Sequence, residues 1–418
     1  MNSLSLYIHL VTHDPAMTHS SNKKRWRPSL LLCIFIAIGC GIGCGMFFPM
    51  WLSRCFATFN AIFSQFLGFC IPLIILGFVA PAIADIGGRA GKMLLFTAAL
   101  AYVATMFAGF LSYFTGVTFF PSMIQPAEYI AGVESGADAA PAPFFNIEMP
   151  PLMAVTSALV IAFVLGLGVA KLTAKDNALH EVLRGFRDVM VKVISGVIIP
   201  LLPLYIFGIF LSMTVSGCVG MILSTFIRII AVIFALHLFL LVFQYSVAAL
   251  FSRHGKNPLK LLWTMMPAYF TALGTQSSAA TIPVTLKQTI KMGVSEPVAG
   301  FTVPLCATIH MSGSVLKLVA CSLALMMING IAYDTGTFAY FIAMLAITII
   351  AAPGVPGGAV MASLGLLSSI LGFSEADNAL MIALYIAMDS FGTACNVTGD
   401  GALSLIVDRF FANKTTTT

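Results

Sequence analysis

Six long apolar segments fill the first 250 residues and constrain what this chain can fold into. They lie at about 29–51, 57–83, 93–120, 152–170, 190–213 and 219–250. At a rise of ~1.5 Å per residue, each is long enough to cross a hydrocarbon core of ~30 Å. Since 59% of all residues are hydrophobic and only 9% are charged, the chain has too little polar surface for a water-soluble globule. The sequence therefore predicts an all-α polytopic membrane protein.

Basic residues occur in every second connection between these segments. They gather in residues 1–28 and then near 89–92, 171–187 and 253–260. Loops rich in Lys and Arg stay on the cytoplasmic side of a membrane. The loop at 121–151 instead has six prolines, four acidic residues and no Lys or Arg, so it is predicted to be external and irregular.

This charge pattern predicts the location of both ends of the chain. We expect a cytoplasmic N-terminal segment at 1–28, a cytoplasmic tail at 412–418 and a multi-pass protein of the plasma membrane, which in bacteria is the inner membrane. A signal peptide is the alternative for the first apolar segment, but no small-residue cleavage site follows it and it exceeds the usual length. The net charge of +5 follows from topology, so it gives no reason to expect nucleic acid as a partner.

Helix-breaking residues interrupt two hydrophobic segments in the last third of the chain. GTQSSAATIP lies within 261–296, and APGVPGG lies within 335–375. Non-helical backbone at membrane depth is tolerated only where it is buried in protein or lines an aqueous cavity. Each segment is therefore predicted to be a re-entrant hairpin. Between them a seventh helix at 297–332 is expected to unwind at TIHMSGS, and an eighth follows at 377–411.

Two carboxylates lie inside the last apolar segment, in the stretch DSFGTACNVTGD from Asp389 to Asp400. A charge near the bilayer centre costs roughly 2.5–3.5 kcal/mol on insertion scales, so such a residue suggests a functional site. Thr393 and Asn396 continue the spacing of four, three and four residues that puts all these side chains on one helix face. Carboxylate and amide oxygens suit a hard cation.

Four motifs in this order and spacing resemble the dicarboxylate/amino acid:cation symporter family, the glutamate-transporter homologues. They are GTQSSAATIPVTL, PLCATIHMSGS, GVPGG and DSFGTACNVTGD, and residues 68–92 also look like that family. The resemblance implies eight transmembrane helices, two re-entrant hairpins and an elevator mechanism in a homotrimer. Segment 29–260 would supply the scaffold and trimer contacts together with the third and sixth helices of the transport part.

The resemblance also implies a substrate site between the two hairpin tips. Serines of the first tip would donate hydrogen bonds to a substrate α-carboxylate, and Asp389 would receive the substrate ammonium. The expected substrate contacts are Gln276, Ser277, Ser278, Gly354, Val355, Pro356, Gly357, Asp389, Gly392, Thr393 and Asn396.

The chain departs from the family at two positions that bear on substrate charge. Relatives that carry acidic substrates place arginine where this chain has Gly392, and some relatives have arginine where it has Gln276. A buried carboxylate without a charged partner is penalised by several kcal/mol. We therefore expect a small neutral amino acid, similar to serine, threonine or alanine. An acidic amino acid or a dicarboxylate is the alternative.

The expected cation ligands also differ from the family pattern. The family usually reads NMDGT in the unwound helix, whereas this chain has His310, Ser312 and, five residues later, Lys317. Asp400 and Asn396 could bind Na⁺, and His310 or Lys317 could replace a sodium ion or carry a proton. Na⁺, H⁺ or both are thus the expected coupling ions, and no other cofactor is expected. The alternative is that both side chains are merely hydrogen-bonded within the bundle or reach an interface.

Other function classes fit less well. A channel needs a continuous polar pore, whereas the polar groups form one C-terminal cluster. No GxSxG or HExxH motif supports an enzyme. A substrate sensor that has lost transport stays an open alternative.

Overall fold

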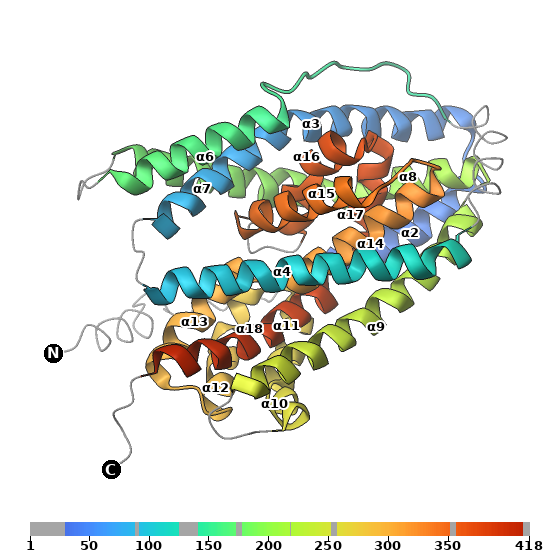
Figure 1. The fold of residues 1–418 in the computed structure, drawn as a ribbon. Coiled ribbons are helices and arrows are strands. Elements are labelled where there is room, and N and C mark those ends of the chain that lie inside the picture. The colour runs from blue at the N-terminus through green and yellow to red at the C-terminus, as the bar shows by residue number, and fades with distance from the viewer. Residues whose placement is uncertain are drawn as a thin grey trace, which may run out of the picture.

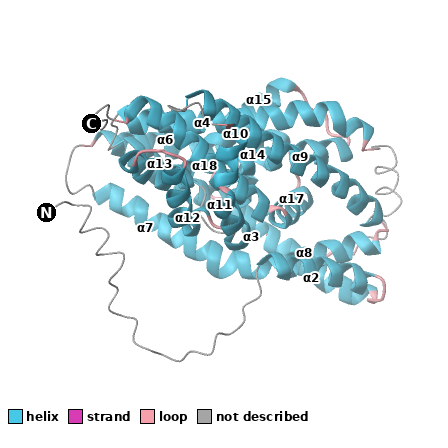
Figure 2. Cartoon of the chain, turned by 90° about the horizontal axis from the view of Figure 1, so that it is seen from below, coloured by secondary structure: helices cyan, strands magenta, loops and turns pink. Residues whose placement is uncertain are grey.

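The computed structural model describes residues 30–87, 92–124, 141–172, 178–217, 219–251, 257–351 and 357–412. Every regular element in these ranges is helical (Figures 1 and 2). Five helical stretches within them are long and apolar enough to cross a membrane, and a bent helix pair would add a sixth. The prediction of an all-α protein with several membrane-crossing helices is thus confirmed. The predicted segment 1–28 lies outside the described residues, as does the tail beyond residue 412.

The first half of the chain consists mainly of long helices. α3 packs along α6 and α7, and α2 packs along α8 (Figure 1). A five-residue π-helical turn, Ile194–Ile198, joins α7 to α8. The helices are α2 (Leu30–Gly45), α3 (Met50–Gly87), α4 (Lys92–Phe119), α6 (Val155–Lys171), α7 (Ala178–Val193), α8 (Ile199–Val215) and α9 (Val219–Phe251).

The described part of the proline-rich loop, residues 141–154, is irregular, as its composition predicts. It lies against the start of α3. The Nε of Arg54 donates to Ala142 O at 3.0 Å, and the guanidinium lies 4.3 Å from the centre of the Phe144 ring. The hydroxyl of Thr58 accepts from Phe144 N at 2.9 Å. These contacts attach the loop to the bundle.

The last third is built from shorter helices. Side-chain caps start several of them: Asn257 caps α10, Ser277 caps α12, Asp334 caps α15, and Ser374 forms a capping box with Asp377 at α17. The helices are α10 (Pro258–Thr264), α11 (Met266–Thr275), α12 (Ser278–Lys291), α13 (Glu296–Ile309), α14 (Ser312–Ile328), α15 (Thr335–Thr348), α16 (Gly358–Leu371), α17 (Glu375–Ala387) and α18 (Asp389–Phe411).

Two pairs of these helices occupy the segments predicted as hairpins. α11 pairs with α12, and α15 with α16. These helices have 10 to 14 residues. At ~1.5 Å per residue they reach only about 15–21 Å, which is too short to cross a membrane alone. The segment 297–332 is interrupted at His310, and this break separates α13 from α14.

A second break was not predicted. The segment 377–411 was expected to be one helix, but α17 and α18 are bent by 61° at Met388. No glycine or proline lies at this break, so its signal in the sequence is limited to Asp389 and Ser390, residue types common at helix starts. Asp389 is consequently the first residue of a helix and does not lie within one.

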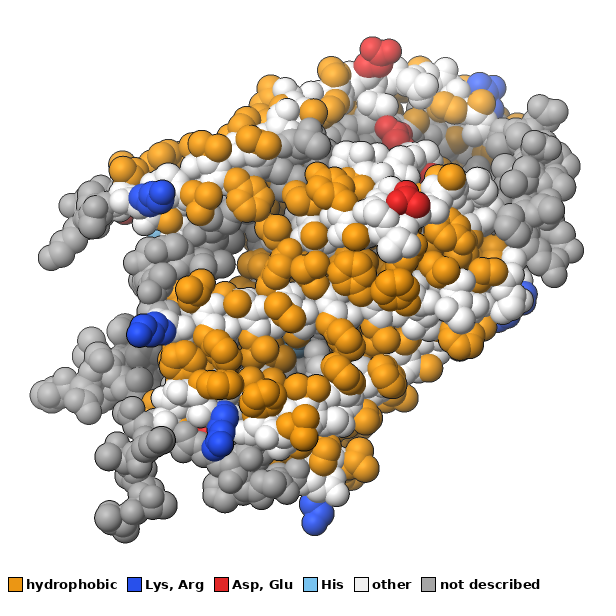
Figure 3. All heavy atoms as spheres, in the orientation of Figure 1, with side chains coloured by type: hydrophobic (Ala, Val, Ile, Leu, Met, Phe, Trp, Pro, Cys, Tyr) orange, Lys and Arg blue, Asp and Glu red, His pale blue; other side chains and the backbone are white. Residues whose placement is uncertain are grey.

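The interior of the molecule is formed by α14 and α18. Every residue of α14 from Ser312 to Ile328 is buried, and so is α18 from Gly392 to Asp408. The outer helices instead expose large apolar side chains, such as Phe114 of α4 and Leu238 of α9. Figure 3 shows apolar side chains across the middle of one face, with Lys and Arg near its margins. This pattern is expected where lipid surrounds the bundle and the polar groups point inward.

Candidate functional site

The two helix breaks bring α14 and α18 into close contact. Gly313, in the first turn of α14, lies directly against α18. An added Cβ there would be 2.6 Å from Cys395 Cβ and 2.7 Å from Gly392 O. Real Cβ atoms do not approach so closely, so only glycine fits at this position. The SGS sequence that predicted a break thus also permits the close approach of the two helices.

Asn396 satisfies the exposed backbone at the start of α14. Its Oδ1 accepts from Gly313 N at 2.7 Å and from Ser314 N at 3.3 Å, and its Nδ2 donates to the Ser314 hydroxyl at 3.0 Å. The first N–H groups of a helix have no partner within it. Asn396 therefore acts as a cap supplied by another helix, so its amide is already engaged in holding the break in place.

One ion pair lies on the hairpin side of Asn396, and we name the group around it the lysine cluster: Lys317, Gly357, Tyr385, Met388 and Asp389. The Nζ of Lys317 is 2.9 Å from Asp389 Oδ1. The other carboxylate oxygen accepts from Gly357 N at 2.8 Å. The Lys317 side chain is fully buried, and the Asp389 side chain is 5% exposed. Asp389, expected to receive a substrate ammonium, is thus paired with a cation of the chain itself.

Gly392 is the neighbour that allows this pair to form. A Cβ at position 392 would lie 2.8 Å from Lys317 Nζ and 2.9 Å from its Cε. Positions 276 and 392 carry no basic residue, but a positive charge reaches the space beside Gly392 from α14. Lys317 was expected among the cation-coupling residues, and its amine contacts Asp389. A buried lysine needs a buried carboxylate, and that rule could have suggested the pair from sequence.

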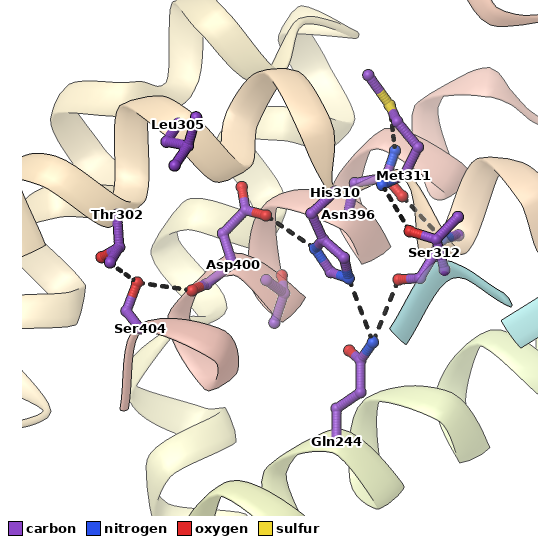
Figure 4. A network of polar contacts seen from close by, with 12 residues as sticks. Gln244, Thr302, Leu305, His310, Met311, Ser312, Asn396, Asp400 and Ser404 are labelled. Atoms are coloured by element: carbon purple, nitrogen blue, oxygen red, sulfur yellow. Dashed lines mark hydrogen bonds and ion pairs between the residues drawn. The ribbon is translucent and has the colours of Figure 1, made fainter. Parts of the chain in front are cut away.

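The second ion pair forms what we name the histidine cluster: Gln244, His310, Ser312 and Asp400 (Figure 4). His310 Nδ1 is 2.9 Å from Asp400 Oδ1, and both side chains are at most 1% exposed. Gln244 of α9 lies across from this pair, with its Nε2 3.5 Å from His310 Nε2 and 3.2 Å from the Ser312 hydroxyl. If Gln244 donates to Nε2, the proton of the ring is on Nδ1 and points at Asp400.

Asp400 keeps one oxygen available. Within the described ranges no hydrogen-bond partner reaches its Oδ2. Its backbone carbonyl accepts from the Ser404 hydroxyl at 2.8 Å, and Ser404 is 2.8 Å from the Thr302 hydroxyl (Figure 4). A buried carboxylate oxygen without a partner suits a cation, whether Na⁺ or a proton. Neither His310 nor Lys317 reaches a membrane interface, since both are buried.

The first hairpin tip lies beside the start of α18. Gln276 has φ of 54°, the left-handed region, and is the sole non-glycine residue of the described chain with a positive φ. Its Nε2 donates to the Ser390 hydroxyl at 2.8 Å, next to Asp389. Ser277 caps α12, and Ser278 is buried at the first position of that helix. A rare backbone conformation held by a contact to another element is typical of binding sites.

The second tip is only partly described. Gly354, Val355 and Pro356 lie outside the described residues, while Gly357 contacts Asp389 through its N–H. Thr393 is buried, one turn after Asp389 on α18. The structure thus brings Gln276, Gly357, Asp389, Gly392 and Lys317 to one place. Asn396 separates them from the histidine cluster.

Two residues in these contacts were missed from sequence. Tyr385 donates its hydroxyl to Ser314 at 3.1 Å, and the centre of its ring lies 3.4 Å from Lys317 Nζ. Gln244 belongs to α9, more than 60 residues before His310. Neither lies in a motif, and the occurrence of a polar side chain within an apolar helix was the available signal for Gln244.

Comparison with known proteins shows the family of the chain. The chain matches the sodium:dicarboxylate symporter family over residues 30–410. It is 27% identical over 400 residues to the serine/threonine transporter SstT of Acinetobacter baumannii. The aligned region covers 91% of this chain and 97% of that relative. It is also 32% identical over 165 residues to the neutral amino acid transporter B(0) of Mus musculus, over 38% of this chain and 29% of that protein. The family resemblance carried by the four motifs is thereby confirmed, and the chain belongs to the sodium:dicarboxylate symporter family of cation-coupled membrane transporters.

Proposed function

We propose that this protein is a secondary active transporter that carries a small neutral amino acid, such as serine, threonine or alanine, together with a cation. The observation that carries the proposal is the environment of Asp389. This carboxylate is buried where both hairpin segments meet α18. Gly357 N of the second segment donates to Asp389 itself, and Gln276 of the first donates to the neighbouring Ser390 hydroxyl. Relatives named as serine/threonine and neutral amino acid transporters support the same substrate class.

Charge balance favours a neutral substrate over an acidic one. The pair of Lys317 and Asp389 has no net charge, and an amino acid zwitterion adds none. A substrate with a second carboxylate would add a buried negative charge, and neither Gln276 nor Gly392 could neutralise it. One unpaired buried ion is disfavoured by several kcal/mol. With an acidic amino acid or a dicarboxylate, Lys317, Asp389 and the substrate would together carry a net negative charge.

We place cation coupling at the histidine cluster. With a neutral imidazole, the pair of His310 and Asp400 carries one negative charge in a fully buried place. A proton on the imidazole, or a Na⁺ ion at Asp400 Oδ2, would neutralise it. Because Ser312 stands where the family usually has aspartate, one negative charge is lost beside His310. This loss removes a hard oxygen donor that Na⁺ would need, so it favours the proton as the coupling ion.

The family resemblance supports a homotrimer in a bacterial inner membrane, with both ends in the cytoplasm and elevator movement of the hairpins with α14 and α18. Native mass spectrometry of the protein released from detergent would test the trimer. A dimer or monomer under conditions that preserve transport would contradict it.

The test of function is uptake by proteoliposomes containing the purified full-length protein. Radiolabelled serine, threonine, alanine, aspartate, glutamate and succinate would each be offered with and without Na⁺ and across an imposed pH gradient. We expect accumulation of the neutral amino acids. Uptake of succinate or aspartate alone would establish the acidic alternative, and binding without uptake would indicate a sensor.

A further inference from the structure

The amine of Lys317 occupies a complete binding site for an ammonium group. Asp389 Oδ1 accepts from Nζ at 2.9 Å, and the carbonyls of Met388 and Tyr385 lie at 3.4 and 3.5 Å. The centre of the Tyr385 ring is 3.4 Å from Nζ. A carboxylate, two carbonyls and an aromatic face are the groups that bind an alkylammonium ion. The carboxyl end of α17 adds its partial negative charge.

Both carboxylate oxygens of Asp389 are already engaged in this site. Asp389 Oδ1 accepts from Lys317, and Oδ2 accepts from Gly357 N. The Lys317 side chain reaches Asp389 through the space that any side chain at position 392 would fill, since an added Cβ there would meet Nζ, Cε and Cδ at 2.8, 2.9 and 3.2 Å. The present position of the Lys317 side chain therefore depends on the absence of a side chain at Gly392.

We infer that Lys317 is a tethered substitute for the substrate's ammonium, which neutralises Asp389 while the carrier is empty and leaves it when an amino acid binds. The inference rests on the proposed function, which assigns the substrate ammonium to Asp389. A second ammonium on this carboxylate would lie close to the Lys317 amine and be repelled by it, so binding of a zwitterion displaces the lysine. The total charge of Asp389, Lys317 and the zwitterion is zero both before and after the zwitterion binds.

This role gives Lys317 a defined part in the transport cycle. An empty carrier that returns across the membrane with a bare Asp389 would move an unpaired buried charge, which is strongly disfavoured. With Lys317 on Asp389, and with Gly357 N of the second hairpin on the other oxygen, the pair in the empty site carries no net charge. Net uptake needs this return step. Exchange of internal for external substrate does not.

The test separates net uptake from exchange in proteoliposomes, with serine as the probe. Lys317→Met removes the amine at similar length, and Gly392→Ala keeps the amine but adds a Cβ 2.8 Å from its present position, so the amine must shift away from Asp389. We expect both variants to bind serine more tightly and to lose net uptake while they retain exchange. For Lys317→Met the gain in affinity should be at least about tenfold, because the substrate ammonium then neutralises an otherwise unpaired carboxylate. Lys260→Met, an exposed lysine of α10, is the matched control and should behave as wild type.

The outcomes discriminate among explanations. If Lys317 only stabilises the fold or binds the substrate, its variants will lose affinity, and exchange and net uptake will fall together; this result overturns the inference. If Lys317→Met does not fold, the results for Gly392→Ala decide between the explanations, because this variant keeps the charges of both Lys317 and Asp389. If wild-type protein neither binds nor exchanges any amino acid, the proposed function itself fails, and that result is independent of the variants.

Discussion

Asn396 Oδ1 lies 2.7 Å from Gly313 N, and this hydrogen bond joins the start of α14 to the middle of α18. The same side chain also reaches Ser314 through both of its polar atoms. One amide therefore determines how the broken seventh helix is placed against the eighth. It also sets the separation between the lysine cluster and the histidine cluster.

Asn396→Ala should weaken the fold. The change leaves buried N–H donors at Gly313 and Ser314 without an acceptor, which costs about 1–3 kcal/mol for each unsatisfied group. We expect a clearly lower unfolding temperature in detergent, measured by intrinsic fluorescence. Asn257→Ala, which removes an exposed cap of α10, should have a much smaller effect. Equal shifts for the two variants would contradict the role assigned to Asn396.

Asp389→Asn should abolish amino acid uptake. The amide can still accept from Gly357 N, but it leaves Lys317 as an unpaired buried cation. Removing one partner of a buried ion pair costs about 3–5 kcal/mol, so the unfolding temperature should fall as well. The double variant Asp389→Asn with Lys317→Met should recover stability but not uptake. Normal uptake by the single variant would remove the ammonium assignment and favour a dicarboxylate substrate.

Gly392→Arg should disrupt transport in the wild-type background, because its side chain must occupy the space that Lys317 fills. Combined with Lys317→Ala, the same change should restore uptake and shift preference toward aspartate or glutamate. The arginine guanidinium would then form a bidentate pair with the second carboxylate of the substrate. Competition assays with serine and aspartate measure the shift. If the double variant transports but prefers serine as strongly as wild type, position 392 does not set substrate charge.

His310→Gln should remove the part of uptake that responds to a pH gradient without Na⁺. Glutamine can hydrogen-bond to Asp400 but cannot gain a charge. His180→Gln in α7 is the control, and its response to pH should equal that of wild type. Uptake that depends strictly on Na⁺ in the wild type, with no proton flux, would place coupling elsewhere.

A related change should move coupling toward sodium. Ser312→Asp together with His310→Asn recreates the NMDG pattern of the family at positions 310–313 and restores a carboxylate and an amide. We expect uptake by this variant to require Na⁺, since hard oxygen donors favour that ion. Uptake that remains independent of Na⁺ would show that residues outside the histidine cluster select the ion.

Much of this architecture could be predicted from local sequence. The serine and glycine residues at 312–314 predicted the break before α14, and GTQSSAATIP predicted the turn at Gln276. The bend at Met388 lies in a run without glycine or proline, so no strong helix breaker marks it, although Asp389 and Ser390 are residue types common at helix starts. The pairing of Lys317 with Asp389 spans 72 residues of sequence, so it depends on the packing of α14 against α17 and α18. A buried lysine indicates that a carboxylate partner exists, but spacing and motifs do not show which carboxylate it is.

The contact of Gly392 with Lys317 also couples these two positions during evolution. A side chain at 392 would push the end of the lysine away from its present place beside Asp389. Loss of Lys317 would likewise leave Asp389 unpaired until a new basic group arrives. A switch of substrate class by this route passes through a weakened intermediate, so it requires stability in reserve elsewhere in the bundle.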